Sequence, residues 1–523
     1  MDITRRSFFI GGAAAAGAFS AFGGCRFFCS AGLKAGETPK LRFGVVSDIH
    51  ITKIGAGEKL ENWGNNLTFK HTLEWFRSQN VDAVMIAGDM ADNGMVEQLE
   101  AVAQAWYAVF PGDRYPDGRP VEKVFVLGNH DYHGYLYGDH AAKKHPDMAE
   151  RVKHVLRSDF ATRWKRIFNE DYARFYCKCI KGYNFLGQHW DDGSGMETKY
   201  GSCDFGAELK TFLDAKGKTL DPSLPFFYVQ HPHPKDTCYG PWAWGHDSGK
   251  VTALLSAYPN AIAFSGHSHY TLTDERSIWQ GAFTSVGTSS LRYTGMPYNE
   301  FPPVGFENTT TEVKGAWRYN AEKLMGGFST GDCRQGMLWS VYDDCIVVKK
   351  REFLSNLDLG DDWVLPLPSA ESKPFAFVEH AKKFRAPSFP SGAALAVSVV
   401  KAKNRGGKSK DGKESIPVVE RESFKVVAPA VVSDKSARIY RLEFAMESRD
   451  GAKKTKLVVP EGFNHALEHK KSKASSFCLF SCGELGDGEV RFTVTPFNCF
   501  GGRGVPLVSK WVKPSSVASG SKA

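Results

Sequence analysis

Five short polar segments hold the residues of this 523-residue chain that are most able to do chemistry. In chain order they are Asp48-Ile49-His50, Gly88-Asp89-Met90-Ala91-Asp92, Gly128-Asn129-His130-Asp131, His231-Pro232-His233-Pro234 and Gly266-His267-Ser268-His269. Carboxylate, imidazole and amide groups together form a donor set that suits transition-metal ions. Any one segment could be an ordinary turn with a solvated histidine, so the prediction of a metal site rests on the whole set. Together the five segments supply seven candidate ligands.

Each segment follows a short apolar run, which predicts a buried strand. These runs are residues 41–47, 83–87, 123–127, 226–230 and 261–265. Residues 66–78, 96–109 and 249–257 carry apolar side chains at helical spacing, so helices are expected between the strands. Strands that alternate with helices predict parallel pairing, and ligand sites gather at the carboxyl ends of parallel strands. Two further apolar runs, 284–291 and 336–349, are expected to complete a second sheet.

In this order, the five segments resemble the signature of the calcineurin-like metallophosphoesterases, over roughly residues 41–350. The resemblance implies an α/β fold, with a four-layer αββα sandwich and two metal ions. One ion would be held by Asp48, His50, Asp89 and His269. Asp89 would bridge to the second ion, which Asn129, His231 and His267 would also hold. His130 would stabilise the transition state or protonate the leaving group, oriented by Asp131.

The implied reaction is the hydrolysis of phosphate mono- or diesters. Two neighbouring cations lower the pKa of a bridging water, and the resulting hydroxide attacks phosphorus. The mixed nitrogen and oxygen donors leave Fe, Mn and Zn open as the metals. At two positions the sequence departs from known branches of this family, which argues against a close relationship to either branch. Asp92 stands where purple acid phosphatases have a tyrosine ligand, and Asp131 stands where secreted 5′-nucleotidases typically have glutamate.

Substrate selection is expected in the loops that follow the polar segments. Candidate substrate contacts are His233, Tyr239, Trp242, Trp244 and His246. These aromatic residues could equally cover the second layer of the core. The segment His189-Trp190-Asp191-Asp192 could also approach the metals, although an ordinary loop is the simpler interpretation.

The N-terminus resembles a bacterial twin-arginine export signal. Arg5 and Arg6 precede an Ala/Gly-rich stretch that runs to Gly24. The sequence Phe22-Gly23-Gly24-Cys25 then resembles a lipobox, so the protein is expected in the periplasm or tethered to a membrane through Cys25. An ordinary cleaved signal with an incidental cysteine is the alternative.

Beyond residue 389, short alternating strands with Gly, Lys and Ser turns predict a β-sandwich. Residues 490–502 resemble the last strands of a fibronectin type III domain. Residues 381–523 contain 26 Lys and Arg against 13 Asp and Glu, which suggests an anionic glycan or a membrane surface as partner. Solvated lysines on loops are the plainer interpretation. The alternative function is therefore a surface protein with lapsed catalysis, whose basic sandwich binds such a partner.

The sequence carries no nucleic-acid-binding motif, and it leaves the oligomeric state open. The eleven cysteines form no metal-knuckle pattern. The predicted organisation is a signal and linker at 1–36, a catalytic domain at 37–354, a linker at 355–388, a β-sandwich at 389–516 and a tail at 517–523.

Overall fold

The computed structural model describes most of the chain between residues 37 and 517. The described ranges are 37–52, 59, 65–137, 154–191, 193, 203–239, 247–294, 334–368, 372–403, 407–408, 415–416, 420–432, 439–458 and 475–517. The predicted export signal with Cys25 lies outside them, and so do Trp242, Trp244 and His246. Within these ranges, no helix is long and apolar enough to cross a membrane.

The first sheet has seven strands and contains the first three predicted strands in parallel. Its order is β12 (Leu357–Asp358), β11 (Cys345–Glu352), β10 (Gln335–Val341), β1 (Leu41–Val46), β2 (Ala83–Ala87) and β3 (Glu122–Val126), with β13 (Trp363–Pro366) paired to β11. The prediction that residues 336–349 complete the second sheet is wrong, because β10 pairs antiparallel with β1. An apolar run indicates that a strand is buried, but it does not indicate which strand lies next to it in the sheet. Strands β12 and β13 also extend this sheet beyond residue 354, into the segment that the sequence assigned to a linker.

The second sheet has six strands. Its order is β4 (Phe175–Ile180), β5 (Tyr183–Gln188), β6 (Phe226–Val229), β7 (Ala261–Ser265), β9 (Thr284–Gly287) and β8 (Ile278–Gln280). The four strands from β5 to β9 are parallel, and the two edge strands are antiparallel to their neighbours. The predicted strand at 284–291 does belong to this sheet.

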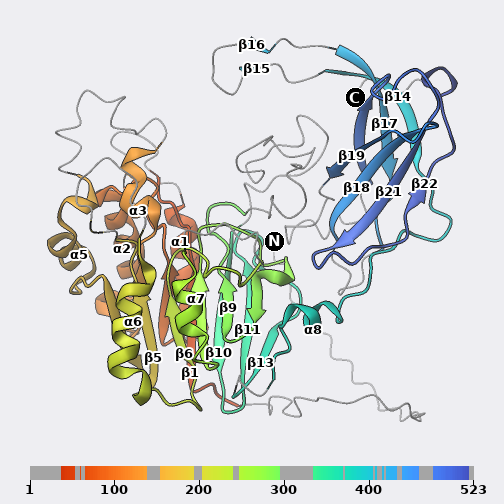
Figure 1. The fold of residues 1–523 in the computed structure, drawn as a ribbon. Coiled ribbons are helices and arrows are strands. Elements are labelled where there is room, and N and C mark those ends of the chain that lie inside the picture. Colours follow the sequence, from red (N-terminus) through yellow and green to blue (C-terminus); the bar gives the residue numbers. More distant parts are fainter. Residues whose placement is uncertain are drawn as a thin grey trace, which may run out of the picture. The chain divides into compact units, whose positions relative to one another are not determined.

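The two sheets pack face to face, and helices cover their outer faces (Figure 1). Between the sheets, the ring of Phe43 on β1 lies 5.2 Å from Phe185 on β5 and 4.9 Å from Phe227 on β6. The helices over the first sheet are α1 (Asn66–Ser78), α2 (Val96–Val109) and α5 (Phe160–Phe168), and those over the second are α6 (Phe205–Lys216) and α7 (Lys250–Leu255). The predicted four-layer αββα sandwich is confirmed.

The C-terminal region contains two antiparallel sheets around a separate core, and a short antiparallel pair, β15 (Gly407–Lys408) and β16 (Ser415–Ile416). One sheet contains β14 (Ala396–Lys403), β17 (Glu420–Ala428) and β20 (Ser476–Ser481); the other contains β19 (Lys453–Val458), β18 (Ile439–Ser448), β21 (Val490–Asn498) and β22 (Leu507–Val508). Phe424 and Phe480 of the first sheet share a core with Phe444 and Phe492 of the second. This confirms the predicted β-rich domain, while the closer resemblance to fibronectin type III stays a prediction.

Candidate metal centre

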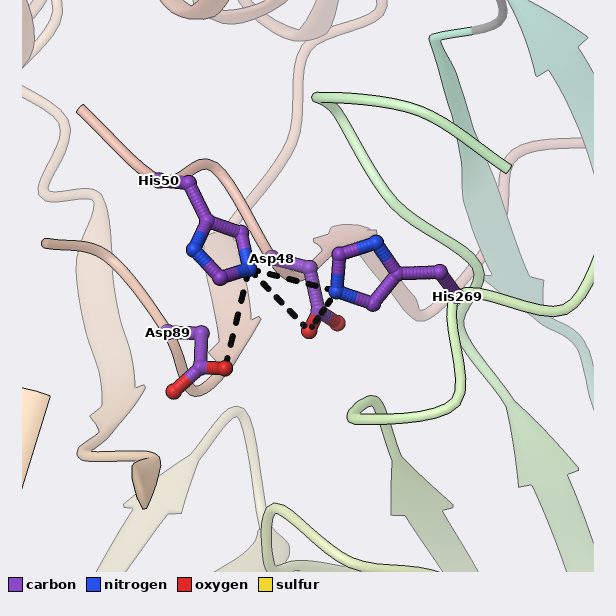
Figure 2. A group of neighbouring side chains, drawn as sticks. All are labelled: Asp48, His50, Asp89 and His269. Carbon is purple, nitrogen blue, oxygen red and sulfur yellow. Dashed lines mark hydrogen bonds and ion pairs between the residues drawn. The ribbon is translucent and has the colours of Figure 1, made fainter. Parts of the chain in front are cut away.

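The loops that follow five strands bring the candidate ligands to one place. Asp48 follows β1, Asp89 follows β2, Asn129 follows β3, His231 follows β6 and His267 follows β7. Figure 2 shows Asp48, His50, Asp89 and His269 converging on a common point. Among the described residues, three groups of ligand-type atoms each lie within 4.8 Å of one another. The first is Asp48, His50, Asp89 and His269, and the second is Asp89, His231 and His267. The third, His50, Asp92 and His130, contains only one of the predicted ligands.

The first group is centred on the imidazole of His50. Its Nε2 atom lies 3.8 Å from Asp48 Oδ1, 3.6 Å from Asp89 Oδ2 and 3.2 Å from His269 Nε2. His269 Nε2 lies 2.9 Å from Asp48 Oδ1. All four side chains are buried. Four inward-facing ligand atoms at this spacing can surround one cation.

The second group shares the carboxylate of Asp89 with the first. Asp89 Oδ2 lies 3.1 Å from His231 Nε2, and His231 Nε2 lies 3.3 Å from His267 Nδ1. The backbone N–H of His130 donates to the other oxygen, Oδ1, at 2.8 Å. Asp89 therefore presents one oxygen to both groups, as the implied bridging role requires.

Asn129 begins the short helix α3 (Asn129–His133), next to Asp89. Its Nδ2 donates to the hydroxyl of Tyr137 at 3.1 Å. Its Oδ1 is buried, and no hydrogen-bond donor among the described residues reaches it. A buried acceptor without a donor is rare because it loses its bond to water. A bound cation would satisfy this oxygen, so the residues present fit a metal.

The backbone at the candidate ligands is strained. Five of the seven ligands have a positive φ, namely Asp48 (51°), His50 (48°), Asp89 (52°), His267 (69°) and His269 (56°). Residues other than glycine seldom adopt this conformation, and it concentrates at functional sites. The sharp turns direct side chains back over the ends of the strands.

Two glycines make room for the ligands. A Cβ atom on Gly88 would lie 2.3 Å from Nδ1 of His231, and Gly88 has a φ of +92°. A Cβ atom on Gly128 would lie 2.2 Å from Oδ1 of Asp89. Each glycine thus admits a ligand from a different strand end. His231 is held there by a 2.7 Å hydrogen bond between its Nδ1 and the carbonyl of Ala87, which leaves Nε2 for the site.

In the metal-free site, His50 and His231 are protonated at neutral pH. Burial lowers the pKa of His50, but the carboxylates of Asp48, Asp92 and Asp89 outweigh burial and raise it from 6.5 to about 9. Burial also opposes protonation of His231, but Asp89 and Asp48 raise its pKa to about 9. Burial alone would raise the pKa of Asp89, but the neighbouring histidines hold it well below the usual range.

Metal affinity is therefore expected to increase with pH up to about 9, because a cation must displace protons from His50 and His231. The metal-free protein should lose stability as the pH rises from 6.5 to about 9, since both pKa values are raised in the folded state. Metal binding should thus raise the melting temperature more at the upper end of this range. Calorimetric titration with Mn²⁺ in buffers of different ionisation enthalpy would count the protons. Proton release that is the same at neutral pH and above pH ~9 would contradict this assignment.

The predicted pairing of His130 with Asp131 is wrong. Asp131 accepts hydrogen bonds from the backbone N–H groups of Ala91 at 2.7 Å, Gly128 at 2.8 Å and Met90 at 3.2 Å. Adjacent residues on a helix point in different directions, so Asp131 turns into the protein while His130 faces the site. Burial raises the pKa of Asp131 to about 7, and Asp89 adds to this effect.

Asp92 orients His130 in place of Asp131. Its backbone carbonyl accepts from His130 Nδ1 at 2.7 Å, and its carboxylate Oδ1 lies 3.1 Å from Nδ1 of His50. Burial lowers the pKa of His130 to about 4, so its ring is neutral in the metal-free site and the lone pair is on Nε2. Asp92 ends the second polar segment of the sequence, where its one interpretation was a departure from another subfamily. The one signal for this role in the sequence is the position of Asp92, three residues after Asp89 on the same loop.

His233 and Tyr239 are buried and hydrogen-bonded within the protein, which corrects their assignment as substrate contacts. Both ring nitrogens of His233 lie within hydrogen-bond distance of serine hydroxyls, Nδ1 at 2.6 Å from Ser265 and Nε2 at 2.7 Å from Ser268. His233 is buried and braces the loop that carries His267 and His269. Tyr239 is fully buried and its hydroxyl donates to the carbonyl of Tyr270 at 3.2 Å. Both side chains therefore stabilise the candidate site from within the core, because the loop that carries them after β6 folds over that core.

Three residues near the site were not assigned from the sequence. The ring of Trp190 lies 6.2 Å from His231 and 6.0 Å from His267, so one residue of the 189–192 segment does approach the second group. The ring of Tyr293 lies 4.3 Å from His269, and its carbonyl lies 3.1 Å from Nδ1 of His269. Arg292 pairs with Asp92. The segment that carries Arg292 and Tyr293 has no motif that could have marked it.

Comparison with known proteins gives one family and a set of solved structures. Residues 41–271 match the family described as calcineurin-like phosphoesterase, and this range contains all seven candidate ligands. No curated protein matches the chain. A dimetal phosphatase from Danio rerio is 15% identical over 63% of this chain and 99% of its own, with a TM-score of 0.32. A purple acid phosphatase from yellow lupin (Lupinus luteus) is 13% identical over 62% of this chain and 54% of its own, with a TM-score of 0.37.

Proposed function

Because residues 41–271 match the calcineurin-like phosphoesterase family, we propose that this protein hydrolyses phosphate esters with two metal ions bound at the seven candidate ligands. The observation that carries the proposal is the position of Asp89. Its Oδ2 atom lies 3.6 Å from Nε2 of His50 and 3.1 Å from Nε2 of His231, at the junction of the two ligand groups. A carboxylate in this position can bridge two cations.

Bound there, the ions would polarise the phosphoryl group and lower the pKa of a water molecule. The chain supplies the framework for this chemistry. Asp92 and the carbonyl of Ala87 fix the rings of His50 and His231 so that each presents Nε2 to the site. A rigid, buried ligand set needs little rearrangement when charge develops in the transition state, which is the main source of such catalysis.

We assign to His130 the transfer of a proton to the leaving group. Its Nδ1 donates to the carbonyl of Asp92, so Nε2 is the atom that exchanges a proton with substrate. Burial keeps the free ring neutral, with a pKa of about 4. An anionic phosphoryl group beside the ring favours its protonated form, so substrate binding would load the proton that the leaving oxygen takes.

The proposal is tested by assaying p-nitrophenyl phosphate and bis-p-nitrophenyl phosphate with protein from which metals have been removed by chelation. We expect turnover to disappear on chelation and to return when Mn²⁺, Zn²⁺ or Fe²⁺ is added back. His130→Ala should keep its metals and lose on the order of 10²–10⁴-fold in kcat on an alkyl phosphate, whose alkoxide leaving group needs a proton, and much less on the p-nitrophenyl esters. Metal-loaded protein that hydrolyses neither ester would instead favour the alternative of lapsed catalysis.

A further inference from the structure

Arg292 is a cation at the edge of the candidate metal centre that the ligand set does not use. Its segment follows β9, and three hydrogen bonds fix it, two of them to the residues that follow β1 and one within the segment. The N–H of Leu291 donates to the carbonyl of Ser47 at 3.0 Å, the hydroxyl of Ser290 donates to the carbonyl of Asp48 at 3.0 Å, and the N–H of Arg292 donates to the hydroxyl of Ser290 at 2.9 Å. The backbone of Arg292 is therefore fixed relative to the ligand Asp48.

The guanidinium group of Arg292 contacts Asp92, which lies beside His50 and His130. Its Nη1 donates to Oδ1 of Asp92, and this oxygen lies 3.1 Å from His50 Nδ1 and 3.9 Å from His130 Nδ1. The side chain is 28% exposed. A guanidinium carries five N–H donors in a planar fork, and Asp92 is the one carboxylate that it contacts among the described residues. Asp92 thus holds the fork in position while donors remain for a ligand in the site.

We propose that Arg292 binds a non-bridging oxygen of the substrate phosphoryl group and makes the centre selective for phosphomonoesters over diesters. This inference rests on the proposed phosphoesterase function. A monoester presents three non-bridging oxygens and up to two negative charges, whereas a diester presents two such oxygens and one charge. Two cations held by the candidate ligands would engage two oxygens, so a third donor would gain an oxygen of its own only in a monoester. Arginine suits this role because its fork matches phosphate geometry.

A purely structural role is the competing explanation, in which Arg292 only neutralises Asp92. The two roles differ in what they predict for the product. A phosphate-binding arginine contributes to the affinity for inorganic phosphate, which carries the same oxygens as a monoester. An arginine that only braces Asp92 would affect His50, and hence metal binding and both ester classes, to a similar extent.

The test compares wild type, Arg292→Gln and Arg292→Lys after the metal content of each has been measured. We expect Arg292→Gln to keep both metals, to lower kcat/KM for p-nitrophenyl phosphate by roughly 10- to 100-fold relative to bis-p-nitrophenyl phosphate, and to weaken calorimetric binding of inorganic phosphate to a similar extent. Arg292→Lys, which keeps the charge beside Asp92 but loses the fork, should recover only part of both. The matched control is Arg166→Gln, which removes an arginine paired with Glu100 at 2.7 Å on the helical layer and should change neither quantity.

Equal losses for the two esters, or unchanged phosphate affinity in metal-loaded Arg292→Gln, would overturn the inference. If Arg292→Gln loses metal, the same comparison is made with Arg292→Lys, and an unchanged ester ratio there overturns it as well. The failure of the broader proposal looks different, because wild-type protein with two bound metals would then hydrolyse neither ester.

Discussion

Asp89→Asn is expected to lower kcat on the order of 10³-fold or more and to reduce the metal content from two ions per chain toward one. Among the described residues, Asp89 is the one that the first and second ligand groups share. The amide is nearly isosteric with the carboxylate, so its nitrogen or oxygen still fills the space, but it carries no charge to share between two cations. The change therefore tests charge and bridging rather than packing. Metal content by mass spectrometry and steady-state turnover would measure the two effects.

The control for this substitution is Asp214→Asn, on the exposed face of α6. In the described part of the chain, Asp214 pairs with Lys210 alone, and both side chains are more than half exposed. An exposed pair contributes little to stability, so this variant should keep both metals and full turnover. If Asp89→Asn retained two tightly bound ions and most of its activity, Asp89 would not be the bridge.

Gly88→Ala is expected to destabilise the protein and to disable the second ligand group. The methyl group would lie 2.3 Å from His231 Nδ1, the atom that binds the carbonyl of Ala87. A left-handed φ costs about 1–2 kcal/mol for alanine, and overpacking a buried site costs about 1–3 kcal/mol more. Because His231 must move, we also expect metal affinity to fall by about 10- to 100-fold. Denaturant unfolding and metal titration would measure the two losses.

Gly118→Ala separates the backbone cost of a positive φ from the steric clash with His231. Gly118 also has a positive φ, of +85°, but nothing lies within 4 Å of the position that its Cβ would take. This variant should lose only the backbone contribution, about 1–2 kcal/mol, and keep its metal affinity. Equal losses of metal affinity in the two variants would show that the fit of His231 against Gly88 is unimportant.

The sequence predicted the parallel strands and the ends at which the ligands gather. Short apolar runs followed directly by Asp48, Asp89, Asn129, His231 and His267 were sufficient, because burial and strand-end chemistry are both local signals. The choice of His231 over His233 also agrees with the structure, in which His231 contacts Asp89 and His233 contacts two serines.

The errors concern side-chain direction and long-range pairing. The order Asn129-His130-Asp131 suggested that neighbours in sequence cooperate, but the first turn of α3 separates the directions of His130 and Asp131. Arg292 reaches Asp92 across 200 residues, and no local pattern reports such a contact. Likewise, β10 is as apolar as a strand of either sheet, and only its register with β1 assigns it to the first.

The central claim is that two cations share Asp89, and anomalous diffraction from metal-loaded crystals tests it most directly. The account predicts two anomalous peaks per chain, roughly 3.5–4 Å apart. One should lie among Asp48, His50, Asp89 and His269, and the other among Asp89, Asn129, His231 and His267. A single peak, or two peaks of which neither lies beside Asp89, would contradict it.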